Sequence, residues 1–267
     1  MRLPLTRGLA MALMLAAWAA MAGDFEEGVK FHADKQYAKA RSAFLRAAAQ
    51  GSAMAKLTLG LMYFNGDGVA RDYKQAASWY RQAATQGEAK AQFNLGLMYT
   101  NGQGVAQDYK HAAFWYRKAA GQGDPRAQYN MGLMYANGLG VGRDDQQAIS
   151  WYQQAAAQGY ATAQVNLAVM YTNGQGIARD YDEAVSWFQK AAAQGNARGQ
   201  YNLGLMYANG RGVAQDYAEA YKWFHLGAEN GDEGARKNRE ILRERLSPGQ
   251  LAEAERRVQD FLKTPAK

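Results

Sequence analysis

A unit of 36 residues repeats five times in the middle of this chain without an insertion or a deletion. Each unit ends in a glycine, at Gly87, Gly123, Gly159, Gly195 and Gly231, and an earlier match ends at Gly51. A repeat of this length is typical of stacked supersecondary units, each unable to bury its apolar face alone. Such an array presents extended surfaces rather than an enclosed active site, so the repeat favours binding as the class of function.

Each unit has the pattern of two helices, as its second copy shows. Leu95 and Tyr99 fall on one face of a first helix, and Ala112 and Tyr116 fall on one face of a second. The segment 101–105 between them contains two glycines two residues apart, which predicts a turn. The sequence therefore predicts an all-α array of helix pairs.

An acidic residue follows each loop at the expected start of the second helix. These N-cap candidates are Asp72, Asp108, Asp144, Asp180 and Asp216. Three residues later stand Gln75, Gln147, Glu183 and Glu219, which we predict to be the reciprocal half of a capping box.

The first 22 residues differ from the rest of the chain. Arg2 and Arg7 give a positive start, residues 8–20 are almost wholly apolar, and Ala20 and Ala22 fit the small-x-small cleavage rule. We therefore expect a signal peptide over residues 1–22, with an uncleaved anchor as the alternative. No later apolar run is long enough to span a bilayer, so no transmembrane segment is expected after cleavage.

The composition limits the cellular compartment and the classes of partner that we expect. The chain has no cysteine, which excludes disulfides and a thiol nucleophile. Its formal net charge is +7, and removing the two N-terminal arginines leaves +5, a mild excess that does not indicate a nucleic-acid partner. Together with the expected export, this predicts a periplasmic protein, with secretion as the alternative.

At these residues the chain resembles a known family. The pattern A-x-x-x-L-G-x-x-Y-x-x-G-x-G-V-x-x-D-x-x-x-A-x-x-W-x-x-x-A-A-x-x-G is that of Sel-one-like repeats (SLR), relatives of tetratricopeptide (TPR) repeats. The resemblance implies a right-handed α/α superhelix, or solenoid, of stacked antiparallel helix pairs. The five SLR units are residues 52–87, 88–123, 124–159, 160–195 and 196–231.

The segments on either side of the five units differ from them. In residues 24–51, Gly28 and Ala40 are 12 apart, whereas Gly60 and Ala76 are 16 apart, so we predict a TPR-like first helix pair with a loop shorter by four residues. Residues 232–267 are predicted to form C-terminal capping helices, the last beginning at a capping box of Ser247 and Gln250. Its predicted apolar stripe is Leu251, Ala254, Val258, Phe261 and Leu262.

No catalytic group emerges from the sequence. The histidines, His32, His111 and His225, lack partners at metal-ligand spacing, so neither a metal nor another cofactor is expected. A Tyr-x-Asn triplet occurs five times at the same place in the units, which indicates helix-end architecture rather than the serine-enzyme motif it resembles. Some SLR proteins bind or cleave β-lactams, so binding or hydrolysis of cell-wall peptides or β-lactams is the alternative function.

The resemblance to TPR repeats implies that first helices line a concave groove, at offsets 2, 5, 9 and 12 from each unit's first residue. The candidate site has aromatic anchors (Phe93, Tyr129, Tyr201), amides (Asn94, Asn130, Asn166, Asn202) and cations (Lys90, Arg126, Arg198). Such a groove fits a protein or an extended peptide, possibly an acidic one. Alternatively, the aromatic rings pack between units and the asparagines satisfy helix ends.

These features predict a scaffold or adaptor for protein–protein interaction rather than an enzyme. The family resemblance implies roles such as assembling envelope complexes, regulating a sensor or assisting host interaction. A purely structural spacer is a third possibility.

Overall fold

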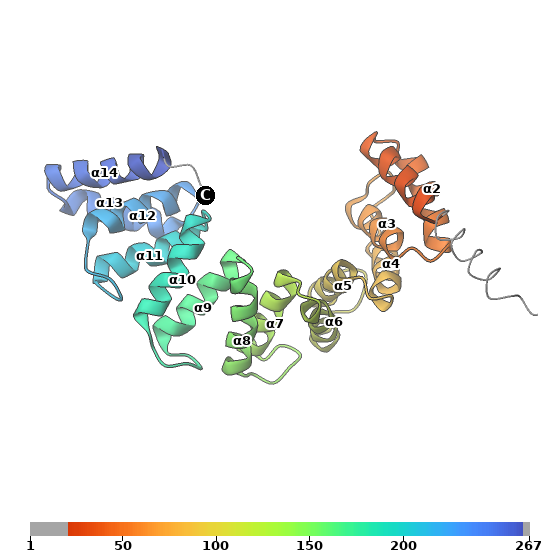
Figure 1. Cartoon of the computed structure of the whole chain (residues 1–267), viewed down its shortest axis with the longest axis horizontal. Coiled ribbons are helices and arrows are strands. Elements are labelled where there is room, and N and C mark those ends of the chain that lie inside the picture. The colour runs from red at the N-terminus through yellow and green to blue at the C-terminus, as the bar shows by residue number, and fades with distance from the viewer. Residues whose placement is uncertain (1–20, 264–267) are drawn as a thin grey trace, which may run out of the picture. The chain divides into compact units, whose positions relative to one another are not determined.

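The structure, a computed structural model, describes residues 21–263, which are helical except for the turns and loops between helices (Figure 1). The predicted signal peptide lies outside the described residues except for its last two. None of the described helices has the length and apolar character needed to cross a bilayer. The predicted all-α fold of helix pairs is confirmed. The chain divides between Asp124 and Pro125 into two compact units, which we treat separately.

Unit 1 begins with a helical segment at residues 21–33 and continues through five labelled helices. These are α2 (Tyr37–Ala49), α3 (Ala53–Asn65), α4 (Tyr73–Thr85), α5 (Ala89–Asn101) and α6 (Tyr109–Gly121). Each helix packs on the next in the chain, from α2 through α6. The loop before α2 has three residues, 34–36, and the loop before α4 has seven, 66–72, a difference of four as the sequence spacing indicates.

Unit 2 contains three helix pairs and two C-terminal helices. The pairs are α7 (Pro125–Asn137) with α8 (Asp145–Ala157), α9 (Ala161–Asn173) with α10 (Tyr181–Ala193), and α11 (Ala197–Asn209) with α12 (Tyr217–Glu229). The last two helices are α13 (Glu233–Arg245) and α14 (Pro248–Lys263), and both pack on α12.

A glycine in the first helix and an aromatic ring in the second hold each pair together. At Gly132, an added Cβ would lie 2.5 Å from the ring of Tyr152, which is buried against the α7 backbone. The pairs Gly60–Tyr80, Gly96–Tyr116 and Gly204–Phe224 repeat this contact. Ala168 replaces the glycine in α9, where it is buried in one cluster with Phe188. A missing side chain is therefore what allows the two helices to approach closely.

The loop aspartates cap the second helices as predicted, but the reciprocal half of the capping box is wrong. Asp144 Oδ1 accepts from the amides of Gln146 and Gln147, each at 3.0 Å. The amide of Asp144 does not bond to the Gln147 side chain; it donates to the carbonyl of Tyr135, at 3.0 Å. The same backbone bond recurs at Asp72, Asp108, Asp180 and Asp216. Because the preceding helix satisfies this amide, the glutamine or glutamate has no capping role there.

A row of buried glutamines links one pair to the next, a feature that the sequence reading did not identify. In unit 2, the amide nitrogen of Gln164 donates to the carbonyl of Ala156 at 3.1 Å, and its oxygen accepts from Gln194 at 2.9 Å. Gln92, Gln128, Gln164 and Gln200 are all buried in this way. Each buried amide thus has hydrogen-bond partners, which fixes the register of neighbouring pairs.

The C-terminal helix α14 begins with the predicted capping box. The Ser247 amide donates to Gln250 Oε1 at 3.0 Å, and the Gln250 amide donates to Ser247 Oγ at 3.3 Å. Arg257 joins the helix to α12 through Asp216 at 2.7 Å and Glu219 at 3.3 Å. Of the predicted apolar stripe, Ala254 and Val258 are buried, Leu251 and Phe261 are half-buried, and Leu262 is 60% exposed. Leu262 is therefore not part of the packed stripe, whereas Phe261, beside it in the chain, packs on Trp223 of α12 with ring centroids 5.3 Å apart.

Candidate functional site

The predicted site residues all lie on first helices. In unit 1, α5 carries Lys90, Phe93 and Asn94. In unit 2, α7 carries Arg126, Tyr129 and Asn130, α9 carries Asn166, and α11 carries Arg198, Tyr201 and Asn202. We call the surface of α7, α9 and α11 that bears these residues the first-helix face of unit 2.

In unit 1, two of the three predicted site residues, Phe93 and Asn94, pack against aromatic side chains of the helix pairs. The Phe93 ring lies 5.8 Å from that of Tyr116, between centroids, and is only half-exposed. Asn94 lies beside the hydroxyl of Tyr80, whose pKa is raised by burial although Asn94 acts to lower it. Lys90 is exposed. This part of the surface therefore has one exposed cation beside aromatic rings that pack in the helix pairs.

In unit 2, Tyr129 is the centre of an aromatic group. Its ring centroid lies 5.9 Å from that of Tyr152, in α8, and 5.3 Å from that of Tyr160, at the start of α9. Tyr152 is buried in the core, whereas Tyr129 and Tyr160 are half-exposed. The three rings thus run from the interior of the pair to its surface.

Asn166 and Arg198 extend this group across the first-helix face. Arg198 Nη1 donates to Asn166 Oδ1 at 3.3 Å. The side chain of Asn166 also lies beside the hydroxyls of Tyr129 and Tyr152, where it acts to lower the pKa of each. Because its oxygen accepts from Arg198, its NH₂ group is the part that faces the hydroxyls. We call Tyr129, Tyr152, Tyr160, Asn166 and Arg198 the tyrosine–arginine cluster; it brings three predicted site residues together.

Burial raises the pKa values of two tyrosine hydroxyls in this cluster. It raises the pKa of Tyr152 to about 12, although Asn166 and Arg198 act in the opposite direction. Burial also raises the pKa of Tyr129, and the neighbouring Tyr160 adds to the effect. The hydroxyls of Tyr129 and Tyr152 therefore ionise only at a pH above the ordinary range of tyrosine.

The other predicted residues of unit 2 do not join the cluster. Asn130 Nδ2 donates to the carbonyl of Arg126, and Asn202 Nδ2 donates to that of Arg198, both at 2.7 Å. Tyr201 packs on Phe224 with ring centroids 6.0 Å apart. For these residues the alternative interpretation, satisfaction of the helix and packing, describes what the structure shows.

A hollow of about 220 Å³ lies at the C-terminal end of the first-helix face. Leu205 and Ala208, at offsets 9 and 12 of their unit, line it together with residues of α13. Among these, Ile241 is 44% exposed and Arg245 is exposed. An apolar wall beside a cation can accommodate the side chain of a bound segment.

Tyr160 is the cluster residue that the sequence analysis missed. It occupies the N-cap position of α9 but makes no side-chain cap hydrogen bond. Ser52, Glu88, Asn196 and Asp232 stand at the same place in other copies, and each accepts from an amide of its helix. A tyrosine among capping residues was the available signal, because a helix start that lacks its cap gives up stability locally.

Comparison with known proteins identifies the repeat. The Sel1 repeat model matches residues 53–88, 89–124, 125–160, 161–196 and 197–232, and the chain belongs to this family. Each match begins one residue after the unit boundaries given above. Sel1 repeats are typical of scaffolds for protein–protein interaction. None of the curated proteins compared matches this sequence.

Two solved structures are similar over most of the chain. One is c5321, a protective antigen of uropathogenic Escherichia coli with an SLR fold: 34% identity, a TM-score of 0.82, 97% of this chain and 56% of that one. The other is a Sel1 repeat protein from Oxalobacter formigenes: 34% identity, a TM-score of 0.76, 80% of this chain and 88% of that one. The chain thus spans little more than half the length of the E. coli antigen.

Proposed function

We propose that this protein is an exported, periplasmic scaffold that holds a partner protein by an extended segment bound on the first-helix face of unit 2. The observation that carries this proposal is the tyrosine–arginine cluster. In this cluster an aromatic ring, an amide and a cation from neighbouring first helices lie next to one another. Such a combination binds peptide segments in many interfaces.

The cluster offers a specific mode of binding. The rings of Tyr129 and Tyr160 present half-exposed apolar surface on which a side chain can stack. Arg198 is exposed, and its guanidinium uses one donor on Asn166, so the remaining donors can pair with a carboxylate of the partner. The hollow beside Leu205 and Ile241 would take an apolar residue further along the same segment.

Export rests on the N-terminal sequence. The positive start, the apolar stretch and the small-x-small site in residues 1–22 support a signal peptide. The absence of cysteine from the sequence is compatible with an oxidising compartment, because no free thiol is exposed to oxidation there. Cell fractionation tests the compartment independently of the binding site.

Site-specific photo-crosslinking tests the binding site. A photoreactive amino acid at Thr162, one turn before Asn166 on α9, leaves the cluster intact. We expect an adduct with a defined protein from this position and none from Gln153, an exposed residue of the second helix α8. The adduct should fall at least about tenfold when Asn166→Ala and Arg198→Ala are combined, because the amide and the guanidinium are then both absent.

Two controls make the result specific. The double variant must retain its helical circular dichroism, and the variant Asn202→Ala, which alters an amide bonded to its own helix, must leave the adduct unchanged. Equal labelling from Thr162 and Gln153, or an adduct that survives the double change, would contradict this site. Either outcome would favour a spacer or a different binding face.

A further inference from the structure

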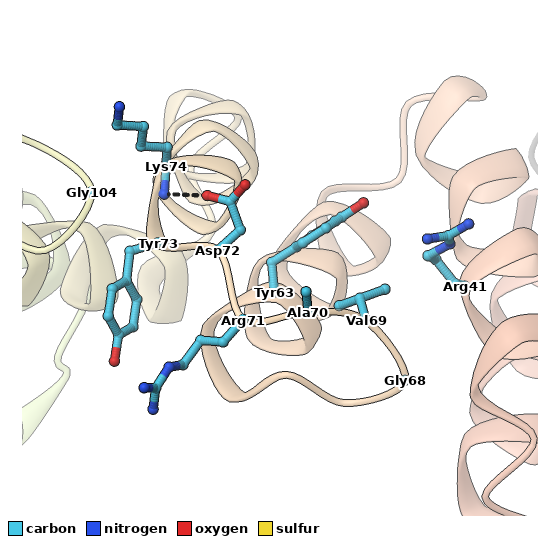
Figure 2. A pocket seen from close by; sticks show the side chains of 10 residues that line it. All are labelled: Arg41, Tyr63, Gly68, Val69, Ala70, Arg71, Asp72, Tyr73, Lys74 and Gly104. Carbon is cyan, nitrogen blue, oxygen red and sulfur yellow. Dashed lines mark hydrogen bonds between the residues drawn. The ribbon is translucent and has the colours of Figure 1, made fainter.

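A pocket in unit 1 lies away from the predicted groove residues, beside the loop that joins α3 to α4. It has a volume of about 640 Å³ and is lined by the loop residues Gly68–Asp72, by the first turn of α4 and by Arg41 of α2 (Figure 2). Tyr63 and Gly104 complete its walls. This volume falls within the range of small-molecule sites.

Arg41 makes this cavity different from the corresponding places in later copies. Its counterparts on the other second helices are buried and uncharged: Ala77, Ala113, Ile149, Val185 and Tyr221. In those copies an apolar residue of the next loop packs in the same cluster as the counterpart, as Ile177 does with Ile149 and Val213 with Val185. In the first pair an arginine takes this place, and the equivalent loop residue, Val69, lines the cavity.

The guanidinium of Arg41 is not satisfied by the protein. Its Nε is buried and has no hydrogen-bond partner within residues 21–263. Figure 2 shows the side chain extending from α2 toward Val69 and Tyr63. A buried donor without a partner costs free energy, so a site that supplies an acceptor is favoured.

The charges around the cavity favour an anion. Arg41, Arg71 and Lys74 line it with a single carboxylate, that of Asp72. Asp72 already accepts from the amides of Lys74, at 2.9 Å, and Gln75, at 3.0 Å, as the cap of α4. Three cations and one carboxylate, whose Oδ1 is engaged, therefore line the pocket, which leaves an excess of positive charge. The side chains of Arg71 and Lys74 extend away from Arg41 (Figure 2).

We propose that this cavity binds a small molecule bearing oxyanionic groups, either carboxylate or phosphate. Arg41 supplies a planar pair of donors to one oxyanion, and Arg71 or Lys74 contacts a second one. The aromatic residue Tyr63 and the side chain of Val69 border the rest of the ligand. The site is distinct from the first-helix face of unit 2 and does not depend on the function proposed for it.

Isothermal titration calorimetry at low salt tests this site with two probes, citrate and inorganic pyrophosphate. We expect the full-length mature protein to bind at least one of them, and the tighter of the two identifies the oxyanion as carboxylate or phosphate. The variant Arg41→Ala, which restores the residue type of Ala77, should fold normally and bind at least about tenfold more weakly. Arg41→Lys should give an intermediate affinity, because it keeps the charge and loses the planar pair of donors.

The chain supplies a matched control in Arg179. This residue stands over the ring of Tyr181 at 5.4 Å, as Arg71 stands over the ring of Tyr73 at 5.4 Å. Ile149 takes the place of Arg41 beside that loop, so Arg179→Gln should leave binding unchanged while Arg71→Gln weakens it. The proposal is overturned if neither probe binds the unaltered protein at millimolar concentration. It is also overturned if the folded Arg41→Ala protein binds as tightly as the unaltered one.

Discussion

Two neighbouring copies of the repeat in unit 2 carry different side chains at equivalent positions of the same helix-pair backbone. In one, the equivalent positions hold Tyr129, Tyr152 and Asn166; in the next, they hold Val165, Phe188 and Asn202. Val165 and Phe188 are both about 1% exposed and have no hydroxyl. Asn202 then returns its NH₂ group to the carbonyl of its own helix.

The difference shows how a repeat becomes a site. Where two hydroxyls are present, Asn166 turns to them and accepts from Arg198. Where they are absent, the same amide has only the helix to bond to. A binding cluster therefore requires several substitutions in register, and the neighbouring copy serves as an internal control for each of them.

The largest change in the free energy of unfolding should follow removal of the buried aromatic ring that both copies have at the equivalent position. Tyr152→Ala and Phe188→Ala should each lower the free energy of unfolding by about 3–5 kcal/mol, because each removes a buried aromatic side chain. Tyr152→Phe should cost only about 1 kcal/mol, the value of one hydrogen bond. Urea unfolding followed by circular dichroism measures all three. A Tyr152→Ala cost far below that of Phe188→Ala would show that Tyr152 serves the site and not the core.

The second-largest effect is a loss of stability at high pH that Tyr152 contributes and Phe188, which does not titrate, cannot contribute. Burial raises the pKa of Tyr152 to about 12 in the folded protein, against about 10 when unfolded. The stabilising contribution of the neutral hydroxyl is therefore complete below pH 10 and is lost as the pH rises to about 12. The loss is roughly 2–3 kcal/mol for this residue.

The variant Tyr152→Phe should lose less stability over this window, because position 152 then resembles Phe188 and no longer titrates. Urea unfolding at several pH values up to 12 gives the slope for each protein. Burial also raises the pKa of Tyr116 to about 12, so the slope should be reduced rather than abolished. Identical slopes in the two proteins would mean that Tyr152 ionises as freely when folded as when unfolded.

The helices could be predicted from the sequence because their signals repeat. A glycine facing a ring, as at Gly132 and Tyr152, occurs at fixed spacing in four copies, and an aspartate cap, as at Asp144, occurs in all five. Because the same signals recur, each copy strengthens the helix assignment in the others. The shorter loop at residues 34–36 could therefore be predicted from the shorter spacing between Gly28 and Ala40. Local propensity and tertiary packing agree throughout this array.

The site was less predictable, because its residues have more than one possible partner. Asn130, Asn166 and Asn202 stand at equivalent positions in their units, so the repeat pattern alone does not distinguish them. Their hydrogen bonds depend on side chains of neighbouring helices, which a single-copy pattern does not contain. Arg41 shows the same limit: its charge is evident, but the cavity beside it follows from how the loop at Val69 packs.

The smallest expected change in the free energy of unfolding concerns the N-cap residues of α9 and α11. Tyr160→Asp restores a capping carboxylate and should raise the free energy of unfolding by about 0.5–1 kcal/mol, measured by urea unfolding. The converse change in the next copy, Asn196→Ala, removes a cap bond of 2.9 Å to the amide of Gly199 and should lower it by about 1 kcal/mol.

Stability and binding should move in opposite directions at this residue. Tyr160→Asp removes the ring that lies 5.3 Å from Tyr129 and places a carboxylate near an acidic partner, so the adduct from Thr162 should decrease. Asn196→Ala, which lies outside the tyrosine–arginine cluster, should leave the adduct unchanged. If Tyr160→Asp stabilised the protein without weakening the adduct, the tyrosine would have no part in binding. If Tyr160→Asp left the free energy of unfolding unchanged, the free amides at the start of α9 would already have other partners. We expect a gain instead, because Tyr160 is half-buried and makes no cap hydrogen bond.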